Sequence, residues 1–160
     1  MTTYSPSTIE IDDDSPEAIV ELFEARGLGD GLPVVAPTPP RVDAMLEHAA
    51  GDPDEVLATL LPRAGIVTRR VVAINAVLAG CTPETFPVVL TAIRALARPE
   101  MNLRGVNATT HPVAPMVLVH GEIATTARFA SGVGAFGPGN RANATVGRAV
   151  RLLKIGRAHV

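Results

Sequence analysis

The chain has 160 residues, of which 47% are hydrophobic, 19% charged and 3% aromatic, and its formal net charge is −2. This length and apolar content suit one folded domain and exclude a fully disordered chain, while the small charge argues against nucleic acid or anionic membrane as partners, because both need clustered cations. The single Cys excludes an internal disulfide and a multi-Cys zinc or iron–sulfur site.

Residues 1–14 are predicted to form a flexible leader. They contain no Lys or Arg and end in three aspartates, so they lack the basic start and apolar stretch of a secretory signal. The longest apolar run, 71–79, is interrupted by Asn75 and is too short to cross a bilayer. We therefore expect a cytoplasmic protein with no membrane partner.

The sequence Ser-Pro-Glu at 15–17 predicts the start of a helix. Ser can cap the first turn, Pro fits within it, and Glu favours the positive end of the helix dipole. Gly27 marks the expected end of this helix. Thr-Pro at 38–39 predicts the start of a second helix, with apolar residues on one face.

Further along the chain, helices are expected to dominate over strands. This balance predicts an α+β fold, or an irregular α/β fold, in a single helix-rich domain spanning 15–154. The expected elements are a strand at 56–61, a buried helix at 68–79, a helix from 82 to 96, a strand at 113–123, a glycine-rich loop at 132–139 and a helix at 140–153.

The segment 131–144 is the leading candidate for a ligand site. Its four glycines permit positive φ and close approach of the backbone to a ligand. It runs into a predicted helix start, where unpaired amides favour an anion. The alternative is a plain glycine-rich connection followed by a solvated Arg face. The predicted anion-binding residues are Gly137, Gly139, Asn140, Arg141, Asn143 and Ala144.

A second candidate is the polar cluster Thr109, Thr110 and His111. Pro112 favours an extended conformation at His111, which suits an imidazole held at the mouth of a strand. His111 is a candidate acid, base or ligand, and either Thr is a candidate for positioning a reacting group. The alternative is that all three only satisfy the loop. No metal site is predicted, because His111 has no partner at ligand spacing.

Cys81 lies between a predicted helix end and the next helix start. Carbonyl groups at the helix end would disfavour a thiolate, whereas exposed amides at the next helix start would lower the thiol pKa. Two interpretations therefore remain: a buried, inert Cys, or a nucleophile that exchanges with a thiol of a partner protein.

Four segments resemble a bacterial family of uncharacterised larger proteins. They are Gly-Asp-Gly-Leu-Pro-Val-Val at 29–35, Ala-Ile-Asn-Ala-Val-Leu-Ala-Gly-Cys at 73–81, Ala-Thr-Thr-His-Pro-Val-Ala-Pro at 108–115 and Phe-Gly-Pro-Gly-Asn-Arg-Ala-Asn-Ala-Thr at 136–145. Members accompany small thioredoxin-like proteins with a Cys/Sec-Gly-Ser-Cys motif, the UGSC group. This chain lacks that motif. The resemblance implies a redox-associated enzyme component with a Cys-Gly-Ser-Cys-type partner.

The C-terminal hexapeptide 155–160 is predicted to be foreign to the protein. Ile-Gly-Arg-Ala-His-Val is also the translation of a common sequencing adapter, and the apolar helical pattern stops at Leu153. We therefore expect a metagenomic fragment cut within or just after a helix, with no role for His159. An ordinary glycine-containing tail is the alternative.

Two hypotheses for the function follow from the sequence. The first is the N-terminal part of a cytoplasmic, redox-linked enzyme subunit that binds a small anionic molecule at 137–144, with His111 beside the anion as acid, base or ligand. The second is a non-catalytic subunit that assembles with itself or with a Cys-Gly-Ser-Cys-type partner. The sequence identifies no cofactor and no substrate.

Overall fold

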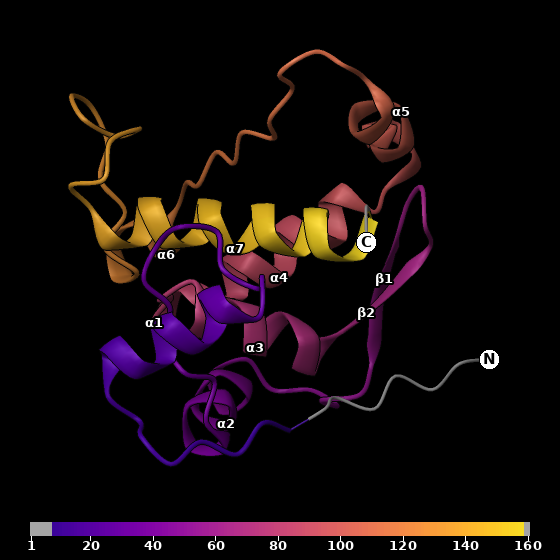
Figure 1. Ribbon diagram of the computed structural model, residues 1–160. Helices are drawn as coiled ribbons and strands as arrows, with labels where there is room; N and C mark the ends of the chain where they lie inside the picture. Colours follow the sequence, from indigo (N-terminus) through magenta and orange to yellow (C-terminus); the bar gives the residue numbers. More distant parts are fainter. Residues whose placement is uncertain (1–7, 159–160) are drawn as a thin grey trace. The chain divides into compact units, whose positions relative to one another are not determined.

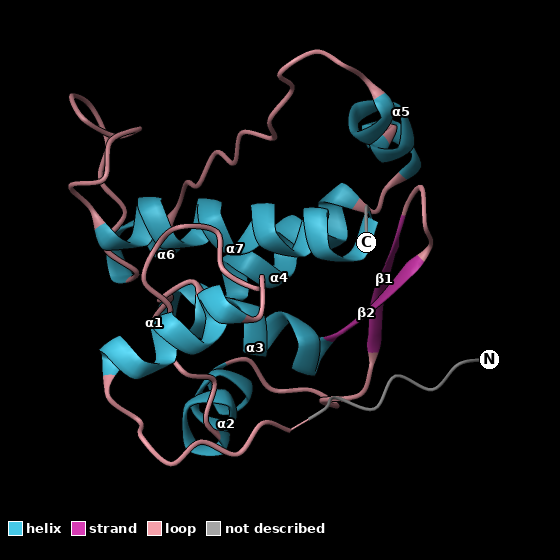
Figure 2. Ribbon diagram, viewed as in Figure 1, coloured by secondary structure: helices cyan, strands magenta, loops and turns pink. Residues whose placement is uncertain are grey.

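The computed structural model describes residues 8–158 (Figure 1). The chain is 49% helical and contains a two-stranded antiparallel sheet, which confirms the α+β class (Figure 2). By its internal contacts it divides into two compact units, residues 1–36 and 37–160. Residues 1–7 of the expected leader, and His159 and Val160 of the C-terminal hexapeptide, lie outside the described residues.

The first unit contains helix α1 (Pro16–Ala25), which begins as the sequence predicts. The hydroxyl of Ser15 accepts a hydrogen bond from the amide of Ala18 at 3.3 Å, so one unpaired amide of the first turn is satisfied. Gly27 follows the helix with a φ of +65°, a conformation that favours glycine and ends the helix.

The second unit holds the other helices and the sheet. The helices predicted to start near 38, 68, 82 and 140 and the strand at 56–61 are confirmed. In chain order the elements are α2 (Pro39–His48), β1 (Val56–Leu60), β2 (Gly65–Thr68), α3 (Arg69–Leu78), the 3-10 helix η1 (Pro83–Thr85), α4 (Phe86–Leu96), the 3-10 helix η2 (Pro99–Met101), α5 (Leu103–Ala108), α6 (Glu122–Thr126) and α7 (Arg141–Ala158).

The β hairpin leads directly into α3. Leu60 pairs with Gly65 beside the turn, and Val56 pairs with Thr68 at the open end. The hydroxyl of Thr68 then accepts a hydrogen bond from the amide of Val71 at 3.3 Å and caps α3. The same threonine therefore ends the strand and starts the helix.

The core of this unit lies where α3, α4 and α7 pack together, with the hairpin against α4 and α7 (Figure 1). Apolar residues at three- and four-residue intervals place one face of each helix inside. The largest fully buried apolar side chains are Phe86, Leu60, Ile93, Leu153, Val67, Val72 and Val89.

The predicted strand at 113–123 is wrong. Residues 112–120 run from α5 toward α6 without joining any strand, and residues 122–126 form α6 instead. The β-branched composition favours an extended chain, but a strand also needs a neighbour, and Pro112 and Pro115 each lack the amide donor that a ladder uses.

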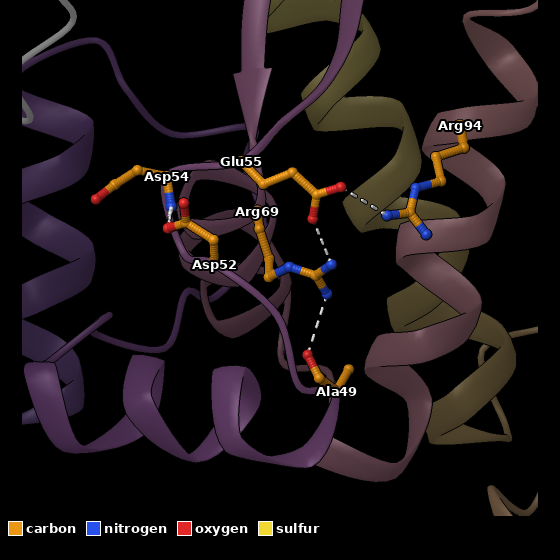
Figure 3. A network of polar contacts seen from close by, with 6 residues as sticks. All are labelled: Ala49, Asp52, Asp54, Glu55, Arg69 and Arg94. Carbon is orange, nitrogen blue, oxygen red and sulfur yellow. Dashed lines mark hydrogen bonds and ion pairs between the residues drawn. The ribbon is translucent and has the colours of Figure 1, made fainter.

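A buried guanidinium ties the end of α2 to the hairpin (Figure 3). Arg69, only 6% exposed, donates to the carbonyl of Ala49 at 3.0 Å and to Glu55 Oε2 at 2.6 Å, and Arg94 donates to Glu55 Oε1 at 3.4 Å. The Arg69 hydrogen bond is the main cause that lowers the pKa of Glu55. A Cβ on Gly51 would lie 2.5 Å from Arg69 Cζ, so any other residue at this position would displace the guanidinium. We call this group the Arg69 network.

Candidate functional site

A pocket of about 330 Å³ lies at the start of α7. Its walls come from η1, from the end of α6 and from the first turn of α7, and we call it the α7 pocket. Two guanidinium groups and one carboxylate are among its side chains, so its net charge is positive. The lining residues are Thr82, Glu84, Thr85, Thr126, Ala127, Arg128, Asn140, Arg141, Ala142 and Thr145.

Arg141, the first residue of α7, lies in the wall of this pocket. Its Nε donates to the carbonyl of Gly80 at 2.9 Å, which holds the guanidinium beside the end of α3. Within residues 8–158, no hydrogen bond or ion pair engages its terminal nitrogens. An exposed, oriented guanidinium of this kind can donate two parallel hydrogen bonds to a carboxylate or phosphate.

Only some of the main-chain amides in the first turn of α7 have an acceptor within the described residues. The Asn140 side chain accepts a hydrogen bond from the amide of Asn143 at 3.0 Å, and the Asn140 carbonyl accepts one from Ala144 at 3.1 Å. The amides of Arg141 and Ala142 have no acceptor within the described part of the chain. Both residues line the α7 pocket, so two donors with partial positive charge remain for a ligand.

The glycine-rich loop before α7 is tied to itself. The side-chain amide of Asn143 donates to the carbonyls of Ala130 at 3.0 Å and Ala135 at 2.8 Å. The main-chain amide of Gly137 donates to the carbonyl of Gly134 at 2.8 Å. The amides of Ala130, Ala135 and Gly137 are therefore used within the loop and are not available to a ligand.

The predicted anion-binding set is thus divided by the structure. Asn140 and Arg141 line the α7 pocket. The positive φ values expected of the loop glycines occur at Gly132 and Gly134, which are not members of the set. The remaining members of the set do not line the pocket; they are Gly137, Gly139, Asn143 and Ala144.

Cys81 lies between α3 and η1, is not among the lining residues of the pocket and is 5% exposed. Burial raises the pKa of its thiol, and this outweighs hydrogen bonds with Thr145 and Thr85 and the positive charge of Arg141, which act in the opposite direction. The thiol is therefore protonated at neutral pH. Thr85, Arg141 and Thr145, which surround the thiol, all line the pocket. A nucleophilic Cys, however, needs a thiolate, and this thiol is protonated.

We expect Cys81 to react slowly with Ellman's reagent in the folded protein at pH 7, because the thiol is both buried and protonated. The same protein in 6 M guanidinium chloride, as the control, should react completely within minutes. The absorbance of the released thiolate measures both rates. Rapid stoichiometric reaction of the native protein would show that the thiol is open and activated.

His111 does not lie at the α7 pocket. It is exposed on the loop after α5, where Thr109 Oγ1 lies 3.2 Å from its Nδ1 and accepts a hydrogen bond from its amide at 3.2 Å. Figure 1 shows α5 well separated from the start of α7. The structure therefore does not bring His111, Thr109 or the exposed Thr110 to Cys81 and Arg141.

Sequence reasoning missed several lining residues of the pocket. Thr145 follows Arg141 by four residues and so shares its face of the helix, a signal that was present in the spacing. Thr85 lies in η1 and Arg128 follows α6, so neither is near Arg141 in the sequence. No local sequence pattern identifies either of them as a lining residue. Arg128 adopts a φ of +59° just after α6, a helix that the sequence pattern did not predict.

The chain matches no protein-family model, no curated protein and no solved structure. Within residues 8–158 no three His, Cys, Asp or Glu side chains are grouped so that they could hold a metal ion. None of the helices in that range has the length and apolar character needed to cross a membrane.

Proposed function

We propose that the protein binds a small molecule with a carboxylate or phosphate group in the α7 pocket. One observation carries the proposal: Arg128, Arg141 and Ala142 line the same pocket of about 330 Å³, and within residues 8–158 the amides of Arg141 and Ala142 have no acceptor. Helix N-termini and guanidinium groups are the donors that proteins use for such anions. The volume suits a small metabolite.

Glu84 narrows the class of ligand. It is the one carboxylate in the lining, and its pKa is lowered, mainly by a hydrogen bond with Thr82, so it stays ionised at neutral pH. The Glu84 carboxylate can accept hydrogen bonds from a ligand, and it repels a ligand that is purely anionic. The pocket therefore favours a molecule that carries a hydroxyl or amino group in addition to its anionic group.

The resemblance to the Cys-Gly-Ser-Cys-associated family supports a role as a subunit of a redox-linked, cytoplasmic enzyme. In this proposal a partner protein supplies the reactive thiol or selenol, because the Cys81 thiol is buried and its pKa is raised. Arg141 and Arg128 hold the anionic group. The exposed His111 has no part in the pocket.

Replacing Arg141 by Ala is expected to weaken anion binding at least tenfold. A hydrogen bond between a charged donor and its acceptor contributes about 1.5–3 kcal/mol, and 1.4 kcal/mol corresponds to a factor of ten. Isothermal titration calorimetry measures the affinity, with glycerol 3-phosphate and malate as probes because each carries a hydroxyl group in addition to its anionic groups. Arg151→Ala is the matched control, because Arg151 is an exposed residue of the same helix outside the pocket.

Arg128→Asn provides a second test, since Asn tolerates the φ of +59° that this position adopts. It should weaken binding without altering the circular dichroism spectrum. Equal losses in Arg128→Asn, Arg141→Ala and Arg151→Ala would show attraction by overall charge rather than a site. Absence of binding heat for both probes at millimolar concentration would remove the proposal.

A further inference from the structure

Arg128 lies at a backbone position that normally selects glycine. It follows the last turn of α6, and its amide donates to the carbonyl of Thr125 at 3.0 Å. The amide of Phe129 donates to the carbonyl of Ala124 at 2.9 Å. This pair of hydrogen bonds is the Schellman motif, in which glycine is preferred because the residue has a positive φ. An arginine held there at a φ of +59° indicates that its side chain has a use.

The turn that carries Arg128 is fixed to the start of α7. The side-chain amide of Asn140 donates to the carbonyl of Arg128 at 3.0 Å. Two residues further along the chain, the amide of Ala130 donates to the side chain of Asn143 at 3.0 Å. These hydrogen bonds join the end of α6 to the first turn of α7, so Arg128 and Arg141 are held in the wall of the same pocket.

Glu84 lines the pocket from η1 and is exposed. Its pKa is lowered mainly by the hydrogen bond with Thr82, and the positive charge of Arg128 acts in the same direction. Within residues 8–158, however, no ion pair engages Glu84 or either guanidinium of the pocket. A carboxylate also has more acceptor sites than one hydrogen bond uses. A ligand can therefore reach all three charged groups.

The charges of the lining define the charges of a complementary ligand. Two guanidinium groups and one carboxylate line the pocket, so a matching ligand has two anionic groups and one cationic group. A simple dicarboxylate brings like charge to Glu84, and a neutral amino acid leaves one guanidinium without a partner. An acidic α-amino acid, with two carboxylates and one ammonium group at neutral pH, satisfies all three.

We propose that the α7 pocket binds an acidic α-amino acid, with the ammonium group on Glu84 and the two carboxylates on Arg128 and Arg141. This inference rests on the proposed function, because it names the ligand class of the same pocket. The free amides of Arg141 and Ala142 add donors for the carboxylate beside Arg141. Glu84 then distinguishes an amino acid from a hydroxy acid of the same shape, because an ammonium group donates charge-assisted hydrogen bonds and a hydroxyl group does not.

Isothermal titration calorimetry with L-aspartate and L-malate tests the ligand class. The two probes share a carbon skeleton and both carboxylates, and differ only in an ammonium or a hydroxyl group. The wild-type chain is expected to bind L-aspartate at least tenfold more tightly, although malate carries the greater negative charge. L-Alanine, which lacks the second carboxylate, should bind at least tenfold more weakly than L-aspartate. Binding of malate or alanine as tight as that of aspartate would overturn the inference.

Glu84→Gln tests the residue that holds the ammonium group. It should weaken L-aspartate binding at least tenfold without weakening L-malate binding, because it removes an attraction to the first probe and a repulsion of the second. Glu122→Gln is the matched control: it removes an exposed carboxylate of α6 outside the pocket and should change neither affinity. A preference for aspartate that survives Glu84→Gln would contradict the role of Glu84.

The same titrations separate this inference from the proposed function on which it rests. Binding of L-malate with no preference for L-aspartate would leave the anion site in place and overturn only the amino acid as its ligand. Binding of neither probe at millimolar concentration would remove both.

Discussion

Replacing Phe86 by Ala is expected to lower the free energy of unfolding by about 3–5 kcal/mol. Phe86 is the first residue of α4, is completely buried and is the largest of the fully buried side chains. Because α4 packs against α3, α7 and β1, the truncation leaves a cavity at the centre of the second unit. Urea titration followed by far-ultraviolet circular dichroism measures the loss.

Phe136→Ala is the matched control, because Phe136 lies in the glycine-rich loop and is 93% exposed. The same atoms are removed, but almost no buried contact is lost, so the change in stability should stay within about 0.5 kcal/mol. Similar losses in the two variants would mean that Phe86 does not lie in the core of the second unit, or that the loop packs against another surface.

Most helices of this protein were predictable because their signals are local. The Ser15 cap, the proline in the first turn and Gly27 mark both ends of α1 within thirteen residues. The spacing of apolar residues likewise marks the inner face of α4 and α7. These signals depend on the chain's own neighbours, so they can be read from the sequence without knowledge of tertiary contacts.

The segment 113–120 was mispredicted for the opposite reason. Its composition is that of a strand, and the chain is indeed extended there, but a ladder requires a partner from elsewhere. The helix α6 that follows has only a short run of five residues, and composition alone does not distinguish such a run from the end of a strand. Strand propensity therefore predicted the local shape and failed on the pairing.

The site was predictable only in part. Glycines before a helix start indicated an anion site, and Asn140 and Arg141 do line a pocket there. The sequence could not show that Asn143 would use its side chain to close the loop, nor that Arg128 would arrive from α6. It also placed His111 in the same site, because separation along the chain says nothing about distance between loops.

The Arg69 network also had no local signal. Arg is rarely buried, so a sequence pattern assigns Arg69 to the solvent side of α3. The structure buries it because three positions of the connection between α2 and β1 meet around the guanidinium: the carbonyl of Ala49, the glycine at position 51 and the carboxylate of Glu55. Such a position becomes visible only when the tertiary contacts are known.

Replacing Arg69 by Ala is expected to lower the free energy of unfolding by about 3 kcal/mol. The variant loses a charge-assisted hydrogen bond to Glu55, leaves the Ala49 carbonyl without its donor and removes a buried side chain. Arg94→Ala is the matched control, because the Arg94 guanidinium contacts the same carboxylate. The Arg94 side chain is 49% exposed, so solvent screens this ion pair. Its loss should stay below about 1 kcal/mol in the same urea titration. If the two variants lost equal stability, the Arg69 pair would be as solvated as the Arg94 pair, and the network would not tie α2 to the hairpin.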